Sequence, residues 1–378
     1  MNEILIPFNK PYLTGRETEY IREAVASGKI SGNGVFTQKC QAFFESRYGF
    51  KKALLTTSCT DALEMAAILC GVGPGDEVIV PSYTFVSSAL AFVRQGAKIV
   101  FADSRGDEPN MDVSKIEALI TSRTKVIVPV HYAGVACDMD AVMDIATRHN
   151  LLVVEDAAQA IDSYYTGRDG VRRALGSIGH FGCFSFHETK NIISGEGGML
   201  TINDDRFITR AEIIWEKGTN RSQFFRGEVN KYGWVDTGSS FLPSEIVAAF
   251  LWAQLENLDD IQAKRISHWN SYREALAPMA ESLDCRLPFI PPYATNNAHM
   301  FYLVFDGLER RSAFIEKLKS RGVLSVFHYL SLHASPYYAD KHDGRALPES
   351  DRYSDCLVRL PMFYELDTKR VLEVISGR

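Results

Sequence analysis

Short, continuous apolar runs alternate with helical patterns between residues 50 and 205. Because the runs are continuously apolar rather than alternating, they are typical of strands buried on both faces, as in a mostly parallel sheet covered by helices. The segments between them agree: 61–70 repeats small and apolar residues at helical spacing, and 138–149 begins acidic and ends basic. The sequence therefore predicts an α/β fold, with strands at residues 77–80, 98–101, 125–128, 151–154 and 181–184.

The pattern changes near residue 244. A long helical stretch, about 244–277, contains few helix breakers and is expected to join two domains. Beyond it lies a smaller α+β unit, with strands predicted at 300–305 and 323–327 and helices at 311–321 and 368–375. We predict a large domain over residues 1–255, which includes an N-terminal arm at 1–12, and a small domain over 256–378.

Composition restricts the partners of the chain. The 378 residues carry a net charge of −6, with 46% apolar and 23% charged residues, as in an ordered globular protein. The basic residues are dispersed, which argues against nucleic acid as the main partner. The apolar runs are much shorter than the roughly 20 residues of a transmembrane helix, and residues 1–11 lack the basic start and apolar stretch of a signal peptide. We expect a cytoplasmic protein without membrane insertion.

The seven cysteines are scattered along the chain, and no two of them form a C-x-x-C pair. Most lie among apolar or small residues, as is typical of small buried side chains. This pattern favours a reducing compartment and argues against a structural metal site.

Small polar residues at 56–61 close a short predicted strand and open a helix. The free backbone N–H groups and the positive end of such a helix favour binding of a phosphate group. An ordinary helix cap formed by Ser58 or Thr60 is the structural alternative. Taken alone, this motif leaves both interpretations open.

Glu155 and Asp156 end the predicted strand at 151–154. Ligands of open α/β sheets bind beyond the carboxyl ends of the strands, so a carboxylate at this point is well placed to hold a protonated ring nitrogen. The alternative is that Asp156 caps a following helix.

Lys190 follows the predicted strand at 181–184 and precedes a glycine-rich turn at 194–198. A lysine that is desolvated in such a place loses its proton more easily and acts as a Schiff-base nucleophile. The glycines allow the backbone to pass close to a ligand. A solvated loop lysine is the alternative.

An anion site, a carboxylate and a lysine at three strand ends match the three anchors of pyridoxal phosphate, which are its phosphate, ring nitrogen and aldehyde carbon. At these residues the sequence resembles the DegT/StrS family of sugar aminotransferases, pyridoxal phosphate enzymes of fold type I with a smaller C-terminal domain. The resemblance covers essentially the whole chain. It is carried by residues 81–86, 155–159, 185–191, 195–198 and 216–227.

The resemblance implies that Lys190 is the covalent anchor and proton shuttle and that Asp156 pairs with the pyridinium nitrogen. Ser240 stands where family members place an Asn that reaches the neighbouring subunit's phosphate. The other implied cofactor contacts are Gln159 beside the ring hydroxyl, Phe85 stacked on the ring, and Ser185 with the backbone of Cys59, Thr60 and Asp61 at the phosphate. Substrate contacts are expected at His187, His299, His328 and Tyr329, with a structural role as the alternative for each histidine.

The resemblance also implies L-glutamate as amino donor, a nucleotide-linked keto sugar as acceptor, and a homodimer with shared active sites. The resemblance at residues 185–191 and 216–227 implies dTDP-4-keto-6-deoxy-D-glucose as the acceptor, whereas amination at C3 and other stereochemistry stay open. A related 3-dehydratase carries His at the lysine position, so Lys190 argues against that activity. A non-catalytic regulatory protein on the same fold would be expected to have lost Lys190, Asp156 or the glycine-rich turn.

Overall fold

A seven-stranded sheet forms the centre of the region predicted as the large domain in the computed structural model, which describes residues 5–377. The strands are β1 (Lys52–Thr56), β2 (Glu77–Pro81), β3 (Lys98–Ala102), β4 (Thr124–Ile127), β5 (Leu152–Asp156), β8 (Phe181–Ser185) and β9 (Gly198–Ile202). Their order is β1-β9-β8-β5-β4-β2-β3, and only β9 runs antiparallel to its neighbours. A small hairpin, β6 (Tyr164–Thr166) and β7 (Arg172–Ala174), lies outside this sheet. The predicted α/β class with a mostly parallel sheet is confirmed.

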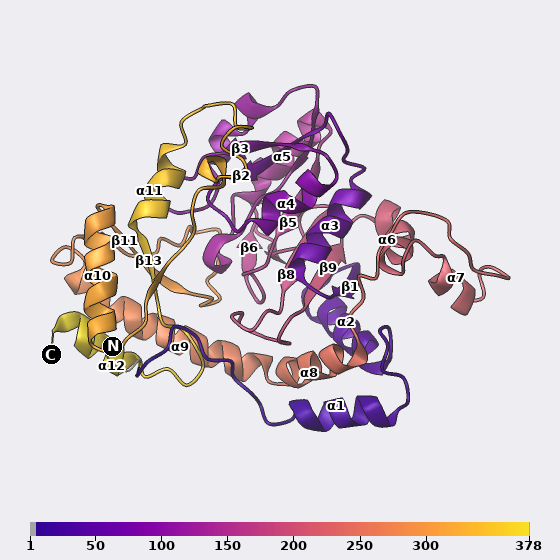
Figure 1. Cartoon of the computed structure of the whole chain (residues 1–378), viewed down its shortest axis with the longest axis horizontal. Coiled ribbons are helices and arrows are strands. Elements are labelled where there is room, and N and C mark those ends of the chain that lie inside the picture. Colours follow the sequence, from indigo (N-terminus) through magenta and orange to yellow (C-terminus); the bar gives the residue numbers. More distant parts are fainter. Residues whose placement is uncertain (1–4, 378) are drawn as a thin grey trace.

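Helices cover both faces of this sheet (Figure 1). One core contains apolar residues of α1 (Glu17–Ala26), α2 (Val35–Tyr48), α5 (Met139–His149) and α8 (Glu245–Glu256). The other contains those of α3 (Cys59–Leu69), α4 (Ser87–Arg94) and α6 (Ile208–Trp215). The two cores explain the continuously apolar strands, because each strand buries both of its faces.

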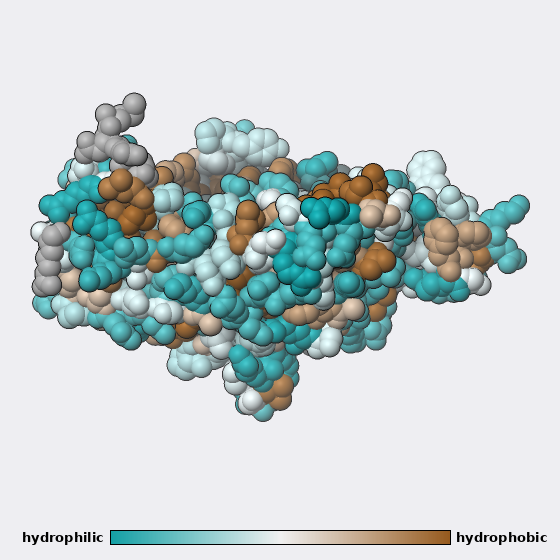
Figure 2. Space-filling model, turned by 90° about the horizontal axis from the view of Figure 1, so that it is seen from below, coloured by the Kyte–Doolittle hydropathy of each residue, from teal (hydrophilic) through white to brown (hydrophobic). Residues whose placement is uncertain are grey.

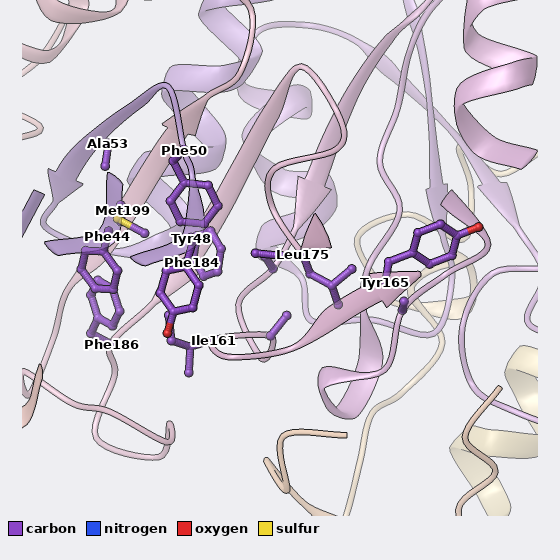
Figure 3. Packing of buried hydrophobic residues seen from close by; sticks show 14 of the residues in the cluster. Phe44, Tyr48, Phe50, Ala53, Ile161, Tyr165, Leu175, Phe184, Phe186 and Met199 are labelled. Atoms are coloured by element: carbon purple, nitrogen blue, oxygen red, sulfur yellow. The ribbon is translucent and has the colours of Figure 1, made fainter. Parts of the chain in front are cut away.

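Aromatic packing fixes the strand that leads to Lys190. Phe186, just beyond β8, stacks on Phe44 of α2 with ring centroids 5.4 Å apart, and Phe184 packs against Phe50 at 5.6 Å (Figure 3). Stacked and tilted ring pairs add to the burial of apolar area. The carboxyl end of β8 is therefore held rigidly where the lysine loop begins.

The small domain has an antiparallel sheet in the order β10-β11-β13-β12. Its strands are β10 (Cys285–Arg286), β11 (Phe301–Phe305), β12 (Val326–Phe327) and β13 (Leu357–Leu360), and its helices are α9 (Leu258–Leu276), α10 (Leu308–Ser320), α11 (Pro348–Cys356) and α12 (Thr368–Ser376). Strands β10 and β13 and helix α11 were not predicted. They are short, and the helix has an acidic and polar sequence without a clear apolar periodicity.

The prediction of one continuous helix at 244–277 is wrong, because the structure has two helices in this stretch. Helix α8 ends at Glu256 and α9 begins at Leu258, because Asn257 between them has φ −110° and ψ 11°. The Asn257 side chain donates a hydrogen bond to the carbonyl of Ala253, and such local bonds compete with helical ones. The two helices still run on from one another along the base of the molecule (Figure 1).

The N-terminal arm contacts the small domain. Leu5 and Ile6 donate backbone hydrogen bonds to Gly322, and Phe8 accepts one from Met362. The arm therefore packs on the domain that is distant in sequence, whereas residues 1–4 of the predicted arm lie outside the described residues. Within residues 5–377, no helix has the length and apolar character to cross a membrane.

Candidate active site

A cavity of about 500 Å³ opens at the carboxyl ends of the central strands. Its walls include residues that follow β1, β2, β4, β5 and β8, together with His299 just before β11, His328 and Tyr329 just after β12, and Arg359 of β13. Of the predicted site residues, the cavity is lined by Cys59, Thr60, Phe85, Asp156, Gln159, Ser185, His187, Lys190, His299, His328 and Tyr329. The topology thus brings together side chains from distant parts of the chain, as expected for an open α/β sheet.

Lys190 contributes an amine without a partner. Its backbone N–H donates to the carbonyl of His187 at 2.9 Å, whereas Nζ makes no hydrogen bond or ion pair with any residue in 5–377. Burial lowers the pKa of this amine, and the positive charge of Arg359 acts in the same direction. The solvated-loop alternative for Lys190 is therefore not supported, and the lowered pKa favours nucleophilic chemistry by this amine.

Asp156 is buried and held by two donors. Ser88 Oγ donates to Oδ2 at 2.6 Å, and the backbone N–H of Ala158 donates to Oδ1 at 3.1 Å. Thr84 Oγ1 is 2.8 Å from Ser88 Oγ, which orients that hydroxyl. Turns rather than a helix follow Asp156, so the alternative that it caps a helix is wrong. Burial raises the pKa of this carboxyl, and a cationic ring nitrogen nearby would oppose that shift.

Glu155 lies on the opposite face of β5 and has a structural role. Its carboxylate accepts backbone hydrogen bonds from Gly176, Ile178 and Gly179 at 2.6 to 2.8 Å. It also lies 2.9 Å from Nε2 of His131, and both side chains are fully buried. Alternation along the strand thus sends one carboxylate of the acidic pair into the cavity and the other into the supporting layer.

The N-terminus of α3 lines one part of the cavity. The Ser58 hydroxyl accepts from the backbone N–H of Asp61 at 3.0 Å, so the capping alternative holds for this residue. The first-turn N–H groups of Cys59 and Thr60 remain without a protein acceptor in the part of the chain that the structure describes. The Thr60 hydroxyl is 2.8 Å from that of Ser87, which also lines the cavity.

Asp61 does not fit its predicted role. Its N–H is already bonded to Ser58, its carboxylate bonds to Thr57, and the residue is not among those lining the cavity.

Gly198, in the glycine-rich motif, has a different role from the predicted close approach of backbone to a ligand. A Cβ there would overlap the backbone of Ser58 and Cys59, so this glycine lets β9 approach the α3 N-terminus rather than a ligand.

Gln159 connects the two domains across the cavity. Its Oε1 accepts from the backbone N–H of Ala133 at 2.6 Å, and its Nε2 donates to Tyr329 Oη at 3.2 Å. Phe85 lies 6.0 Å from Tyr329 between ring centroids and is 55% exposed, which leaves its face open to a ligand ring.

The predicted substrate histidines differ in their surroundings. His187 is partly exposed, with Nδ1 2.9 Å from the Thr189 hydroxyl. His299 and His328 are buried, and burial lowers the pKa of each well below its usual value. Their Nδ1 atoms lie 2.9 Å from Asn191 Oδ1 and from a tyrosine hydroxyl, respectively. Both imidazoles line the cavity, and their contacts with Asn191 and the tyrosine hydroxyl also connect the segments around it. A structural role and a binding role are therefore compatible for each.

Ser240 lies apart from the cavity of its own chain. It sits on the exposed segment after α6, where it bridges to Glu216. A contact from Ser240 to a cofactor phosphate therefore requires a neighbouring subunit, and it stays a prediction.

Sequence reasoning missed Arg359, Phe8 and the pair of hydroxyls at Thr84 and Ser88. Arg359 had a detectable signal, because it is a single charge in the apolar strand β13. Phe8 had none, since its place depends on how the arm packs on the small domain.

The residues present fit pyridoxal phosphate. Free helix N–H groups suit its phosphate, a buried and oriented carboxylate suits its ring nitrogen, and the unpartnered amine of Lys190 suits its aldehyde carbon. Fold and cavity together define a pyridoxal phosphate-dependent transaminase.

The chain belongs to the DegT/DnrJ/EryC1/StrS aminotransferase family, whose model matches residues 11–377. It is 32% identical over 381 residues to the spore coat polysaccharide biosynthesis protein SpsC of Bacillus subtilis, covering 98% of this chain and 96% of the relative. It is 36% identical over 336 residues to GDP-perosamine synthase of Caulobacter vibrioides, covering 87% and 85% of the two chains.

Solved structures of aminotransferases have the same fold as this chain. DesV of S. venezuelae, in complex with a ketimine intermediate, superimposes with a TM-score of 0.88 at 30% identity and 98% coverage of both chains. A putative sugar aminotransferase of Streptococcus pneumoniae, Spr1654 in its PMP form, gives a TM-score of 0.89 at 25% identity and 98% coverage of both chains. The predicted cofactor and the predicted sugar aminotransferase activity are thereby confirmed.

Proposed function

We propose that this enzyme transfers the amino group of L-glutamate to dTDP-4-keto-6-deoxy-D-glucose and forms dTDP-4-amino-4,6-dideoxy-D-galactose. The observation that carries the transaminase chemistry is the free Lys190 amine between the α3 N-terminus and buried Asp156. The choice of sugar rests on residues 185–191 and 216–227, which resemble the corresponding transaminase of enterobacterial common antigen synthesis.

Lys190 is the proton carrier in this proposal. Its amine would hold the cofactor's aldehyde carbon. When free, the same amine would carry the proton of the donor's α-carbon, a role that its lowered pKa favours. Pyridoxal phosphate supplies the ring system that stabilises the negative charge left on that carbon. Asp156, oriented by Ser88 and Ala158, keeps the ring nitrogen protonated.

We also propose a homodimer with shared active sites. The segment with α7 (Arg221–Phe225) projects from the body of the molecule (Figure 1). It carries exposed Phe225, Tyr232 and Trp234, and a projecting segment is visible at one end of the space-filling view (Figure 2). Large apolar side chains exposed together mark an interaction surface. In the proposed dimer, Ser240 at the base of this segment contacts a partner's cofactor phosphate.

The test is incubation of the purified enzyme with L-glutamate and dTDP-4-keto-6-deoxy-D-glucose, followed by NMR of the product. We expect an amine at C4 in the axial position of the galacto configuration. An equatorial amine, or amination of a 3-keto isomer only, would contradict the proposed sugar. A parallel reaction with the GDP-linked 4-keto-6-deoxy sugar tests the nucleotide, since one relative is a GDP-perosamine synthase.

A further inference from the structure

Two basic side chains other than histidine line the cavity among the described residues, Lys190 and Arg359. Arg359 comes from the middle of β13, where its backbone pairs with Tyr302 of β11 and Val326 of β12. Its guanidinium lies 4.6 Å from the centre of the Phe8 ring. The phenol groups of Tyr83, Tyr132 and Tyr329 interact electrostatically with it.

This guanidinium has no anionic partner in the part of the chain that the structure describes. Its Nε is buried without a hydrogen bond, and burial lowers the pKa of the group. A buried charge without a partner is costly, so proteins normally pair it. Arg265 provides the internal comparison: it is buried more completely than Arg359, but its Nε and Nη2 donate to the carbonyls of Ala298 and His299 at 3.1 and 2.7 Å.

The difference between the two arginines indicates a ligand. Arg265 is satisfied by backbone and serves the fold, whereas Arg359 presents donors to the cavity. A planar guanidinium binds a carboxylate through two parallel hydrogen bonds. The cofactor phosphate already has its own place at the α3 N-terminus, so Arg359 is left for an anion on a substrate.

The two substrates differ in where they carry charge. An amino acid donor has a carboxylate on the same carbon that bears the amine, hence one bond from the reacting atom. A nucleotide-linked keto sugar carries its charge on the diphosphate, across the sugar ring from a 4-keto group. Arg359 lines the same cavity as the Lys190 amine, which puts it near the reacting end of a bound substrate.

We propose that Arg359 binds the α-carboxylate of the amino donor and is a specificity-determining residue for the donor half-reaction. The inference rests on the proposed transamination from an amino acid, but not on which sugar accepts the amine. It predicts that Arg359 matters in one half-reaction only, because the acceptor brings no carboxylate to this place.

The first test is binding of 2-oxoglutarate to the pyridoxal form of the enzyme, which cannot react with it, by titration calorimetry. Arg359→Gln should weaken binding by at least about 30-fold, as expected for losing charge-assisted hydrogen bonds, and Arg359→Lys should weaken it less. Arg310→Gln, an exposed arginine paired with Asp284 on the same domain, is the matched control and should bind normally. Binding by Arg359→Gln within threefold of wild type would overturn the assignment.

The second test separates a donor site from a structural role. Single-turnover rates should fall in Arg359→Gln for L-glutamate but change little for the pyridoxamine form with keto sugar. The preference for L-glutamate over 4-aminobutyrate, which lacks an α-carboxylate, should shrink by a similar factor. Equal losses in both half-reactions, or an unchanged preference, would overturn the proposal.

Stability provides the remaining control. Because the charge of Arg359 has no protein partner, Arg359→Met should melt no lower than wild type, whereas a role in holding the domain together predicts a lower melting temperature. A wild-type enzyme that binds 2-oxoglutarate through Arg359 but aminates no keto sugar would refute the proposed function and leave this assignment standing.

Discussion

Replacing Asp156 by Asn removes one negative charge from the cavity and changes little else. The side chain keeps its size. Its amide oxygen can still accept from the backbone N–H of Ala158, and its NH₂ group can donate to the Ser88 hydroxyl, which then acts as acceptor. A charge pair at about 4 Å is worth roughly 4 kcal/mol at an effective dielectric of 20. We expect at least about 2.7 kcal/mol of this to be lost from the transition state, a 100-fold decrease in rate.

The assay is the single-turnover reaction of the pyridoxal form with L-glutamate, together with thermal unfolding of the same preparations. Asp156→Asn should retain cofactor, unfold no earlier than wild type because a buried carboxylate is removed, and react at least about 100-fold more slowly. Glu155→Gln is the matched control. It should lose stability, because an amide N–H₂ would face the backbone N–H donors that Glu155 now accepts from. A near-normal half-reaction in Asp156→Asn would refute the reasoning.

Three further predictions follow from other parts of the structure. Gly198→Ala should push β9 away from the α3 N-terminus and lower cofactor affinity by about tenfold or more. The control Gly73→Ala, whose added Cβ meets only an ordinary contact, should leave the affinity unchanged. Equal affinities of the two variants in a cofactor titration would contradict the role of Gly198. Burial raises the pKa of Glu108 to about 8, so the folded state holds a proton that the unfolded state releases. Stability should therefore fall as the pH rises from about 4.5 to 8, and Glu108→Gln should flatten the melting temperature over that range; an unchanged slope would show that Glu108 is not responsible. If active sites are shared, mixing impaired Lys190→Ala and Ser240→Trp subunits should restore activity to about a quarter of the sites in randomly exchanged dimers, and no recovery after confirmed exchange would exclude a shared site.

The sequence predicted the parts of this enzyme that depend on local pattern. Continuously apolar runs located the central strands, and the chemistry of residue types at strand ends located Lys190 and Asp156 in one cavity. These predictions succeed because the carboxyl ends of parallel strands must meet at one edge of the sheet.

Features that depend on which groups form hydrogen bonds in the folded chain could not be predicted from the sequence. The N–H of Asp61 appears free in a motif, but the Ser58 hydroxyl occupies it once the helix forms. The helix break at Asn257 depends on a side chain that bonds to its own backbone. Arg359 is recognisable as a charge in an apolar strand, yet only the structure distinguishes it from Arg265, whose donors are satisfied.

The central claim is that Lys190 carries the cofactor in the cavity. Reduction of the purified enzyme with borohydride, followed by peptide mapping, tests it most directly. We predict a reduced pyridoxyl label on Lys190 and complete loss of labelling in Lys190→Ala, while Lys217→Ala, an exposed loop lysine, labels normally. A label that maps to a different lysine, or that persists in Lys190→Ala, would contradict the account.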